Sequence, residues 1–373
     1  MGENKRKPDI RFQGFADDWE QRKVSEVCSI STGKSNTQDK TDDGIYPFYV
    51  RSPIIERSNR YLFDEEAVLT VGDGVGTGKV FHYVNGKYDL HQRVYRLFDF
   101  VENVDAKFFY HWFSEKFYDR VMSMTAKTSV DSVRLEMISE MDLIAPSHQE
   151  QQLISRYMDN LDNLITLQQR KYDKLVNVKK SMLEKMFPRE GAKVPEIRFE
   201  GFTDDWEQRK LSDLIIEYKE TVDSDCTLPV LTSSKTEGVV LQEEHFGRVQ
   251  NHDITGYNIL PRNYCTYRNR SDGVDFTFNI NRCCDKGIIS KFYPVFRGNN
   301  SDIFFISMVL NYCDEVVHEI AYTCTGTGQK VLSFLDLQKM NIRVPSYDEQ
   351  KKISQYFEQL DNLITLQQRE QSG

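Results

Sequence analysis

Residues 145–170 read APSHQEQQLISRYMDNLDNLITLQQR, and residues 344–369 read VPSYDEQKKISQYFEQLDNLITLQQR. Both stretches open with Pro-Ser and carry a glutamate three residues after the serine, which is the pattern of a capping box at a helix N-terminus. Apolar residues then recur at alternating spacings of four and three, as in a helix that pairs along a narrow apolar seam. The sequence therefore predicts two similar helices that pack against each other.

The first of these helices is predicted to be long, because no proline interrupts it before Pro188. A length of about 40 residues corresponds to roughly 60 Å at 1.5 Å per residue. Gln168 and Lys179 interrupt its apolar seam, and the second helix, which ends soon after Arg369, is expected to be shortened. The residues predicted to pair the helices or to dock a partner protein are Ile154, Met158, Leu161, Ile165, Leu175, Ile353, Phe357, Leu360 and Ile364.

A second pair of similar stretches precedes the helices. Residues 9–27 read DIRFQGFADDWEQRKVSEV, and residues 196–214 read EIRFEGFTDDWEQRKLSDL. The order is constant segment, variable region, helix, and then the same order again, which indicates an internal duplication. We expect an α+β chain with a pseudo-two-fold repeat: two mixed α/β domains joined by two long helices that form an antiparallel coiled coil. The expected boundaries are 1–145, 146–190, 191–345 and 346–373.

The two variable regions share a plan but little sequence. Each combines strand-like stretches, punctuated by Gly, Asn and Asp, with one amphipathic or apolar helix. In the first region the expected strands lie within 60–74, 79–90 and 92–100 and the helix within 105–123. In the second region the expected strands lie within 238–247, 262–271 and 286–298 and the helix within 303–320.

The amino-acid composition limits the possible classes of protein. The chain carries 48 Lys and Arg against 57 Asp and Glu, a net charge of −9, which argues against a simple basic nucleic-acid coat protein. There is no apolar N-terminal stretch and no run long enough to cross a bilayer, so we expect a cytoplasmic protein without membrane contact and with reduced thiols. The adjacent Cys283 and Cys284, and the lack of a C-x-x-C pair among the seven cysteines, predict no metal site.

A glycine-rich stretch, Gly72 to Lys79, resembles a phosphate-binding loop at first sight. Its spacing is wrong for that loop, and Val80 stands where a serine or threonine should bind magnesium. A tight hairpin between strands is the simpler interpretation. The loop can still bring backbone N–H groups, Thr77 and Lys79 against a DNA phosphate.

Other polar residues have side chains that read bases. His91, Gln92 and Arg93 are predicted to interrupt a hydrophobic strand, where Gln92 suits adenine and Arg93 suits guanine in the major groove. The competing interpretation is that Arg93 pairs with a neighbouring aspartate and the strand is structural. In the second half, the candidates for DNA contacts are Arg268, Asn269, Arg270, Arg282, Lys286 and Lys330.

The sequence predicts no catalytic residues. It lacks the Asn-Pro-Pro-aromatic or Asp-Pro-Pro-aromatic motif of amino-methyltransferases, a cofactor-binding glycine fingerprint after a strand, and a helicase ATP site. Two competing functions remain: a duplicated nucleotide-handling enzyme that uses the glycine-rich loop, and a coiled-coil adaptor whose domains bind proteins. The first is disfavoured because no matching loop is evident in the second half.

The RF-x-GF-x-DDWEQRK opening, the P-S-x-x-EQ-x-x-I-S helix start and the LDNLITLQQR helix strongly resemble type I restriction–modification specificity subunits of Gram-positive bacteria. The GDGVGTGK…HQRVYR region and the GTGQKVLSFLDLQ stretch at 326–338 also resemble the target recognition domains of that family. The resemblance covers almost the whole chain.

This resemblance implies two target recognition domains, each reading one half of a bipartite site in double-stranded DNA. It implies that the helices fix the spacing between the halves and are gripped by two methyltransferase subunits, with restriction and translocase subunits joining for cleavage. The chain itself would be non-catalytic and bind no cofactor, because S-adenosylmethionine, ATP and magnesium would be bound by the partner subunits. The short second helix departs from the family, in which both helices extend.

Overall fold

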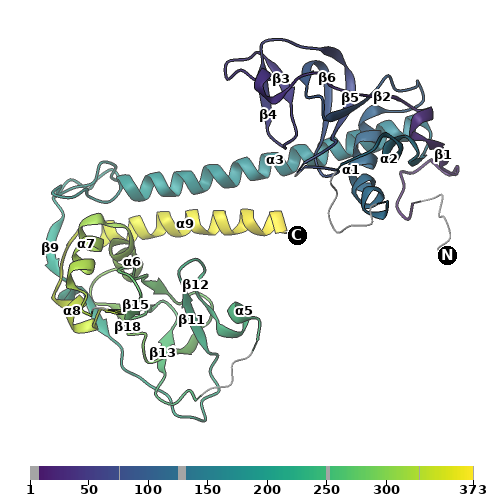
Figure 1. Ribbon diagram of the computed structural model, residues 1–373. Helices are drawn as coiled ribbons and strands as arrows, with labels where there is room; N and C mark the ends of the chain where they lie inside the picture. Colours follow the sequence, from purple (N-terminus) through teal and green to yellow (C-terminus); the bar gives the residue numbers. More distant parts are fainter. Residues whose placement is uncertain (1–7, 75, 125–131, 249–252, 327, 373) are drawn as a thin grey trace. The chain divides into compact units, whose positions relative to one another are not determined.

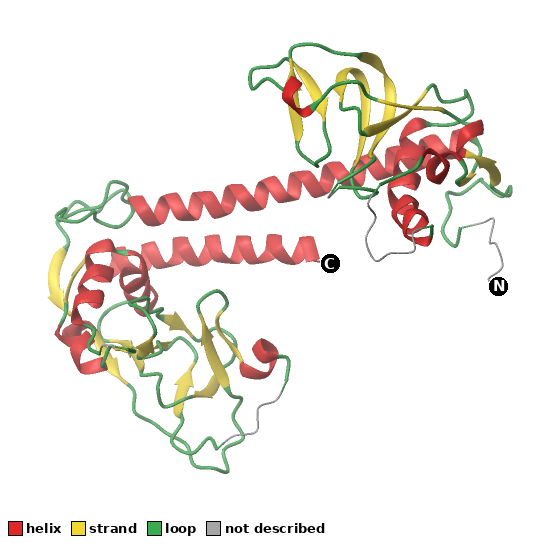
Figure 2. Cartoon of the chain, in the orientation of Figure 1, coloured by secondary structure: helices red, strands yellow, loops and turns green. Residues whose placement is uncertain are grey.

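The computed structural model describes residues 8–74, 76–124, 132–248, 253–326 and 328–372, so Val75 and Thr327 of the two glycine-containing stretches lie outside the described residues. The chain divides into two compact units, residues 1–166 and residues 167–373. Each unit combines β-sheet with helices (Figure 2). The mixed α/β architecture and its repetition agree with the sequence.

The first unit contains a six-stranded sheet whose order is β2, β7, β5, β6, β3 and β4 (Figure 1). The strand β3 runs parallel to β6, and the other neighbouring strands are antiparallel. Both faces of β5 are covered. Val68 packs in a cluster with buried residues of the helix α1, Ala106–Ser123, while Leu69 packs on the opposite side with Tyr88 and Leu90. The bounds are β2 Ser29–Thr32, β3 Tyr46–Tyr49, β4 Ile55–Ser58, β5 Phe63–Val71, β6 Phe81–Leu90 and β7 Val94–Phe98.

The helix predicted within 105–123 is confirmed as α1, Ala106–Ser123. Asp105 begins it, because its Oδ1 accepts a hydrogen bond from the backbone N–H of Phe108 at 2.8 Å. Phe109, Phe113 and Phe117 lie on one face at helical spacing and are all fully buried, so this aromatic row joins α1 to the sheet. Shorter helical segments are η1 Val24–Glu26, η2 Thr37–Asp39 and α2 Leu135–Ser139.

The second unit has a four-stranded sheet of order β10, β18, β14 and β16, and it also contains the two-stranded ladders β11–β12, β13–β17 and β15–β19. The single helix predicted within 303–320 is wrong in one respect: the chain forms two helices, which meet at Cys313 because that residue is extended, with ψ of 112°. The bounds are β10 Ile215–Glu217, β11 Leu231–Ser234, β12 Gly238–Leu241, β13 Asn258–Pro261, β14 Cys265–Thr266, β15 Arg270–Ser271, β16 Asn279–Ile280, β17 Lys286–Ile289, β18 Val295–Gly298 and β19 Lys330–Val331. The helices are α4 Leu211–Leu214, α5 Gln242–Phe246, α6 Ile303–Tyr312, α7 Asp314–Thr323 and α8 Phe334–Lys339.

The constant segments form the same two-stranded ladder in both units. In the first unit β1, Glu20–Lys23, pairs with β8, Asp142–Ala145, and Glu20 lies opposite Ala145. In the second unit β9, Glu207–Lys210, pairs with β20, Asn341–Val344, and Glu207 lies opposite Val344. Each ladder therefore joins the DDWEQRK segment to the residues that lead directly into a long helix.

The two long helices are confirmed as α3, His148–Lys185, and α9, Tyr347–Ser372. The glutamate of each predicted capping box has a different partner from the one expected. Glu150 accepts two hydrogen bonds from Arg11, both at 2.7 Å, and Glu349 accepts two from Arg198, also both at 2.7 Å. These carboxylates are almost fully buried, so the arginine of the RF segment neutralises a buried charge in each unit.

The next residues of each helix extend this connection. The Gln151 side chain accepts from the Asp105 backbone N–H at 2.9 Å, and Ser155 donates to the Asp105 carboxylate at 2.6 Å. Gln350 and Ser354 contact Asp302 in the same way, at 3.0 and 2.6 Å. Since Asp105 and Asp302 cap α1 and α6, the E-Q-x-x-I-S motif holds the start of the long helix against the start of the domain helix.

Within the second unit, α9 runs antiparallel to the part of α3 that belongs to this unit (Figure 1). Gln367 donates to Gln168, and Lys179 pairs with Asp361 at 2.5 Å, so the two polar residues that interrupt the predicted seam contact the opposite helix. Leu175 packs against a buried cluster that includes Ile353, Phe357 and Leu360. Of the described helices, none combines the length and apolar composition that a bilayer crossing requires.

The buried arginine–glutamate pair can be tested by removing one partner. Glu349→Ala leaves Arg198 without its counter-charge, so we expect the second unit to lose about 3 kcal/mol of unfolding free energy. Urea unfolding followed by circular dichroism measures the loss. Glu200→Ala, which removes an exposed glutamate, is the matched control. Equal stability of the two variants would contradict the structural role of the pair.

Candidate nucleic-acid interface

The residues His91, Gln92 and Arg93 do not interrupt a strand as predicted, but form the turn between β6 and β7. His91 is buried, and its Nδ1 accepts a hydrogen bond from the backbone N–H of Arg93 at 3.0 Å. Burial lowers the pKa of His91, and the charge of Arg51 lowers it further, which keeps Nδ1 available as an acceptor. The His91 ring therefore fixes the turn that presents Gln92 and Arg93.

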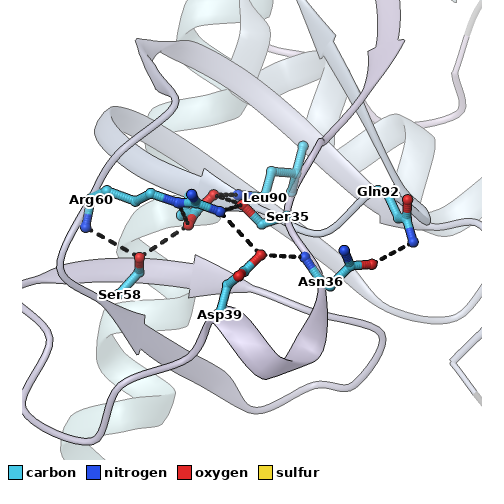
Figure 3. Close-up of polar contacts among 8 residues, drawn as sticks. Ser35, Asn36, Asp39, Ser58, Arg60, Leu90 and Gln92 are labelled. Carbon is cyan, nitrogen blue, oxygen red and sulfur yellow. Dashed lines mark hydrogen bonds and ion pairs between the residues drawn. The ribbon is translucent and has the colours of Figure 1, made fainter.

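Gln92 is exposed and lies beside Asn36, a residue that the sequence analysis missed (Figure 3). Its Nε2 donates to Asn36 Oδ1 at 2.6 Å. Among the described residues, no other hydrogen bond uses Gln92 Oε1 or Asn36 Nδ2. The pair therefore offers one acceptor and one donor side by side, which is the complement of the N6 donor and N7 acceptor of adenine.

A buried aspartate organises the segment that carries Asn36. Asp89 is fully buried and accepts hydrogen bonds from Ser35 Oγ at 2.5 Å, Ser58 Oγ at 3.0 Å and the Leu90 backbone N–H at 2.8 Å. Arg60 adds a contact to this carboxylate at 3.5 Å and donates to Ser35 Oγ at 3.0 Å (Figure 3). Because these polar groups satisfy one another, the network holds the 35–36 segment in a defined position.

Arg93 lies at the other side of the turn with its side chain 63% exposed. Its Nε is 3.6 Å from Asp73, which confirms the alternative that Arg93 pairs with a nearby aspartate. Arg51, which the sequence analysis did not identify, contacts the other Asp73 oxygen at 3.5 Å. Two half-exposed guanidinium groups thus share one carboxylate and keep donors available at the surface.

The glycine-rich loop follows β5 and meets this turn. The backbone N–H of Gly72 donates to the Arg93 carbonyl oxygen at 2.8 Å, and a Cβ at position 72 would also lie 2.8 Å from that oxygen, so glycine is required there. Thr77 is buried and donates to the Gly74 carbonyl at 2.5 Å. Lys79 is exposed, with its ammonium 4.7 Å from the centre of the Tyr118 ring.

In the second unit, the structure brings Arg268, Asn269, Arg270 and Lys330 together. Ser271 lies opposite Lys330 in the β15–β19 ladder, and the Arg270 guanidinium is 4.7 Å from the centre of the Phe292 ring. Arg268 and Arg270 are exposed and line a hollow of about 630 Å³. Further residues lining the hollow include Ser233, Lys235, Asp272, Asp275 and Tyr293.

The structure gives the other two candidates of the second half different surroundings. Arg282 donates to Glu358 on α9 and to Asn263 Oδ1 at 2.6 Å, and its guanidinium lies 5.4 Å from the Phe304 ring centre. Lys286 is exposed at the start of β17. Arg282 therefore has partners within the protein, and its contact with DNA stays a prediction, as does that of Lys286.

The polar segments of the two units are anchored in the same way. In the first unit the Gly72 carbonyl accepts from the Val133 backbone N–H at 2.7 Å, and the Tyr95 hydroxyl donates to the Val133 carbonyl at 3.2 Å. In the second unit the Asn269 carbonyl accepts from Leu332 at 3.0 Å, and Tyr267 donates to the Leu332 carbonyl at 3.0 Å.

The matching loop that the sequence comparison did not find is therefore present in the second unit. Val133 and Leu332 are 199 positions apart, the same separation as between the helix starts. The tripeptide Asp-Gly-Val at 73–75 also recurs at 272–274, again 199 positions later. The similarity of the two loops was missed because the glycine-containing residues 76–79 of the first loop are replaced by Asp-Phe-Thr-Phe at 275–278 in the second.

The fold and its site define an internally duplicated α/β protein, in which two equivalent domains present two different polar loops. The family model for the type I restriction modification DNA specificity domain matches twice, over residues 16–177 and 203–372. The chain therefore belongs to the family of type I restriction–modification specificity subunits, and each half carries one copy of the specificity domain.

The individual relatives have low sequence identity to this chain. The EcoDI type I restriction enzyme specificity subunit of Escherichia coli is 26% identical over 144 residues, which covers 39% of this chain and only 31% of that subunit. The MjaVIII specificity subunit of Methanocaldococcus jannaschii is 22% identical over 391 residues, which covers 95% of this chain and 88% of that subunit. The crystal structure of the S subunit of a type I restriction–modification system from M. genitalium superposes with a TM-score of 0.57 at 12% identity, covering 98% of this chain and 95% of that one.

The Asp89 network yields a prediction for the first unit. Asp89→Ala removes the hydrogen bonds from Ser35, Ser58, Arg60 and the Leu90 backbone N–H, and it leaves the two serine hydroxyls without their acceptor, so we expect a loss of about 2 kcal/mol of unfolding free energy. Hydrogen exchange should also become faster at the backbone amides of Lys34 and Ser35. Asp64→Ala, at an exposed position of β5, is the control. Wild-type stability and exchange in the Asp89 variant would rule out this organising role.

Proposed function

We propose that this chain is the DNA-reading subunit of a type I restriction–modification complex. Each specificity domain reads one half of a bipartite target in the major groove of double-stranded DNA. The two long helices set the gap between the half-sites and dock two methyltransferase subunits, and restriction and translocase subunits complete the assembly. The chain is non-catalytic in this proposal, with S-adenosylmethionine, ATP and magnesium bound by the partners.

The observation that carries the proposal is that the same backbone hydrogen bonds support two polar loops of different sequence. Gly72 in the first unit and Asn269 in the second are held by the same hydrogen bonds, yet the side chains around them differ in type. Two similar supports with different donors and acceptors suit a protein that reads two different sequences. A protein-binding adaptor would not require exposed arginine and amide groups at both equivalent positions.

In the first domain, we assign the Asn36–Gln92 pair to adenine, because the two amides present a donor next to an acceptor. Arg93 is assigned to guanine, and Arg51 to an adjacent phosphate. The Asp89 network supports this assignment, since a base-reading group gains discrimination when it is ordered before it binds. Lys79 is a further candidate for a phosphate contact.

In the second domain, we assign base reading to Arg268 and Arg270, which line the hollow beside Lys235 and Tyr293. Lys330 and Lys286 are assigned to phosphates. The stacking of Arg270 on Phe292 supports a reading role, because an aromatic face restricts a guanidinium to one plane while leaving its N–H groups free to bind an acceptor.

The spacing role of the helices is supported by their pairing. Opposed apolar and ionic contacts between α3 and α9 restrict sliding of one helix along the other, and the gap between half-sites read by a duplicated protein is a geometric property of such a connector. The net charge of −9 also fits an assembly in which partner subunits contribute much of the phosphate clamp.

Co-expression with the cognate methyltransferase, followed by long-read sequencing of the host genome, tests the proposal. We expect methylated adenines at one bipartite motif with a single fixed gap. The control is the methyltransferase expressed alone, which should leave no such motif. A stable complex of the two proteins that methylates no bipartite motif would refute the DNA-reading role.

Substitutions should separate the two half-sites. Arg93→Ala should relax the sequence requirement in one half-site, and Arg270→Ala should relax it in the other, each by about 1–3 kcal/mol of discrimination at one base pair. The methylated motifs of the two variants measure the effect. Should either variant weaken methylation equally at all sites, that arginine binds a phosphate instead of a base.

A further inference from the structure

The loop between β3 and β4 lies at the same end of the six-stranded sheet as the 91–93 turn. The strands β3 and β6 are parallel, with Tyr49 opposite Leu90, so the segments that follow them leave the sheet at one edge. The backbone N–H of His91 also donates to the Tyr49 carbonyl oxygen at 3.0 Å. Residues 50–54, here called the β3–β4 tip, are therefore neighbours of the turn that is proposed to read bases.

The β3–β4 tip also contacts the glycine-rich loop. Nη1 of Arg51, in the tip, is 3.5 Å from Oδ1 of Asp73, and Nε of Arg93 is 3.6 Å from the other oxygen of the same carboxylate. A Cβ at Gly76 would lie 3.2 Å from the Arg51 carbonyl oxygen, so the loop passes close to the backbone of the tip. The tip, the glycine-rich loop and the turn therefore form one surface of the first unit.

An apolar side chain is exposed on the β3–β4 tip. Ile54 is 69% exposed, although it follows Arg51 by only three residues. Its backbone is held locally, because Pro53 has a restricted φ and Ser52 Oγ accepts a hydrogen bond from the Ile54 backbone N–H at 3.3 Å. An apolar group that is ordered before binding can make a contact at a small cost in conformational entropy.

The second unit has an equivalent hairpin with a different tip. The strands β11 and β12 form this hairpin, and a parallel bridge joins Val230, which precedes β11, to Ile288 in β17, as β3 is joined to β6. The second tip, residues 235–237, reads Lys-Thr-Glu and contains no apolar residue. Lys235 pairs with Asp275 of the second polar loop, which repeats the ion pair of the first tip. The two domains therefore share the position of the tip and differ in its apolar residue.

We propose that Ile54 contacts the 5-methyl group of a thymine in the half-site that the first domain reads. This inference deepens the proposed function and rests on it. The thymine methyl is the apolar group that base edges present in the major groove, and it distinguishes thymine from the other bases there. The amides of Asn36 and Gln92 and the guanidinium of Arg93 suit the hydrogen-bonding edges of bases, whereas an isoleucine beside them suits that methyl group.

The charge around the tip favours DNA over a protein as its partner. The side chains of Arg51 and Arg93 are 48% and 63% exposed, and they share the single carboxylate of Asp73. The surface therefore carries more positive than negative charge next to its exposed isoleucine. A positively charged surface with one ordered apolar side chain is complementary to a phosphate backbone and a methyl-bearing base edge.

The test uses the complex of the full chain with its cognate methyltransferase and a duplex that carries the methylated motif. Each thymine of both half-sites is replaced in turn by deoxyuridine, which lacks only the methyl group. We expect one replacement to weaken binding by the wild-type complex about fourfold, because one methyl group loses its apolar contact. The same replacement should change binding by less than about 1.5-fold in Ile54→Ala, since the contact is already absent. Fluorescence anisotropy of the labelled duplex measures both effects.

Ile45→Ala is the matched control. Ile45 is 70% exposed and immediately precedes β3, so it lies at the opposite end of that strand from the tip. This variant should keep the full deoxyuridine effect of the wild type. Ile45 and Ile54 are both exposed, so neither substitution should unfold the domain, and circular dichroism verifies that each variant is folded.

Several outcomes overturn the thymine contact. No deoxyuridine replacement weakens wild-type binding, or the replacement costs as much in Ile54→Ala as in wild type, or Ile45→Ala loses the effect as well. If Ile54→Ala prevents assembly with the methyltransferase in the absence of DNA, the tip is a protein-binding surface instead. A bipartite motif methylated by the wild-type complex alongside any of these results leaves the proposed function intact, whereas the absence of any such motif refutes both proposals.

Discussion

The buried pairing of one arginine with one glutamate underlies the architecture of each half. Glu150 and Glu349 have almost no contact with solvent, and a carboxylate in that position is tolerated only with a bidentate partner. Arg11 and Arg198 supply it from segments well over a hundred residues earlier in the sequence. Because the glutamate begins a long helix and the arginine precedes the edge ladder, this one interaction connects the two ends of each domain.

The residues that support each domain differ from those that we propose to read DNA. The EQRK strands, the helix starts and the caps Asp105 and Asp302 recur in both units with the same hydrogen bonds. The groups at the tips, such as the Asn36–Gln92 amides and the Arg268–Arg270 run, differ between units. Residues that stabilise the fold are therefore seldom those that would contact DNA. Substitutions in the loops need not destabilise the β1–β8 and β9–β20 ladders.

Local signals were enough to predict the helices α3, α9 and α1, because apolar periodicity acts over a few residues. Predictions failed where distant residues decide the conformation. The 91–93 turn depends on Gly72, which lies close to the Arg93 carbonyl, and the extended Cys313 separates two helices that periodicity had joined. Asn36 and Arg51 were missed because only folding brings them beside Gln92 and Asp73.

The Gln168–Gln367 contact also constrains how the gene can change. A surface that pairs with a copy of itself must stay self-complementary, so a substitution in one repeat is selected together with its counterpart in the other. Both glutamines belong to ten residues that are identical in the two repeats, 161–170 and 360–369, in a chain whose variable regions share little sequence. A substitution at either glutamine therefore alters a contact between two equivalent positions of the repeat.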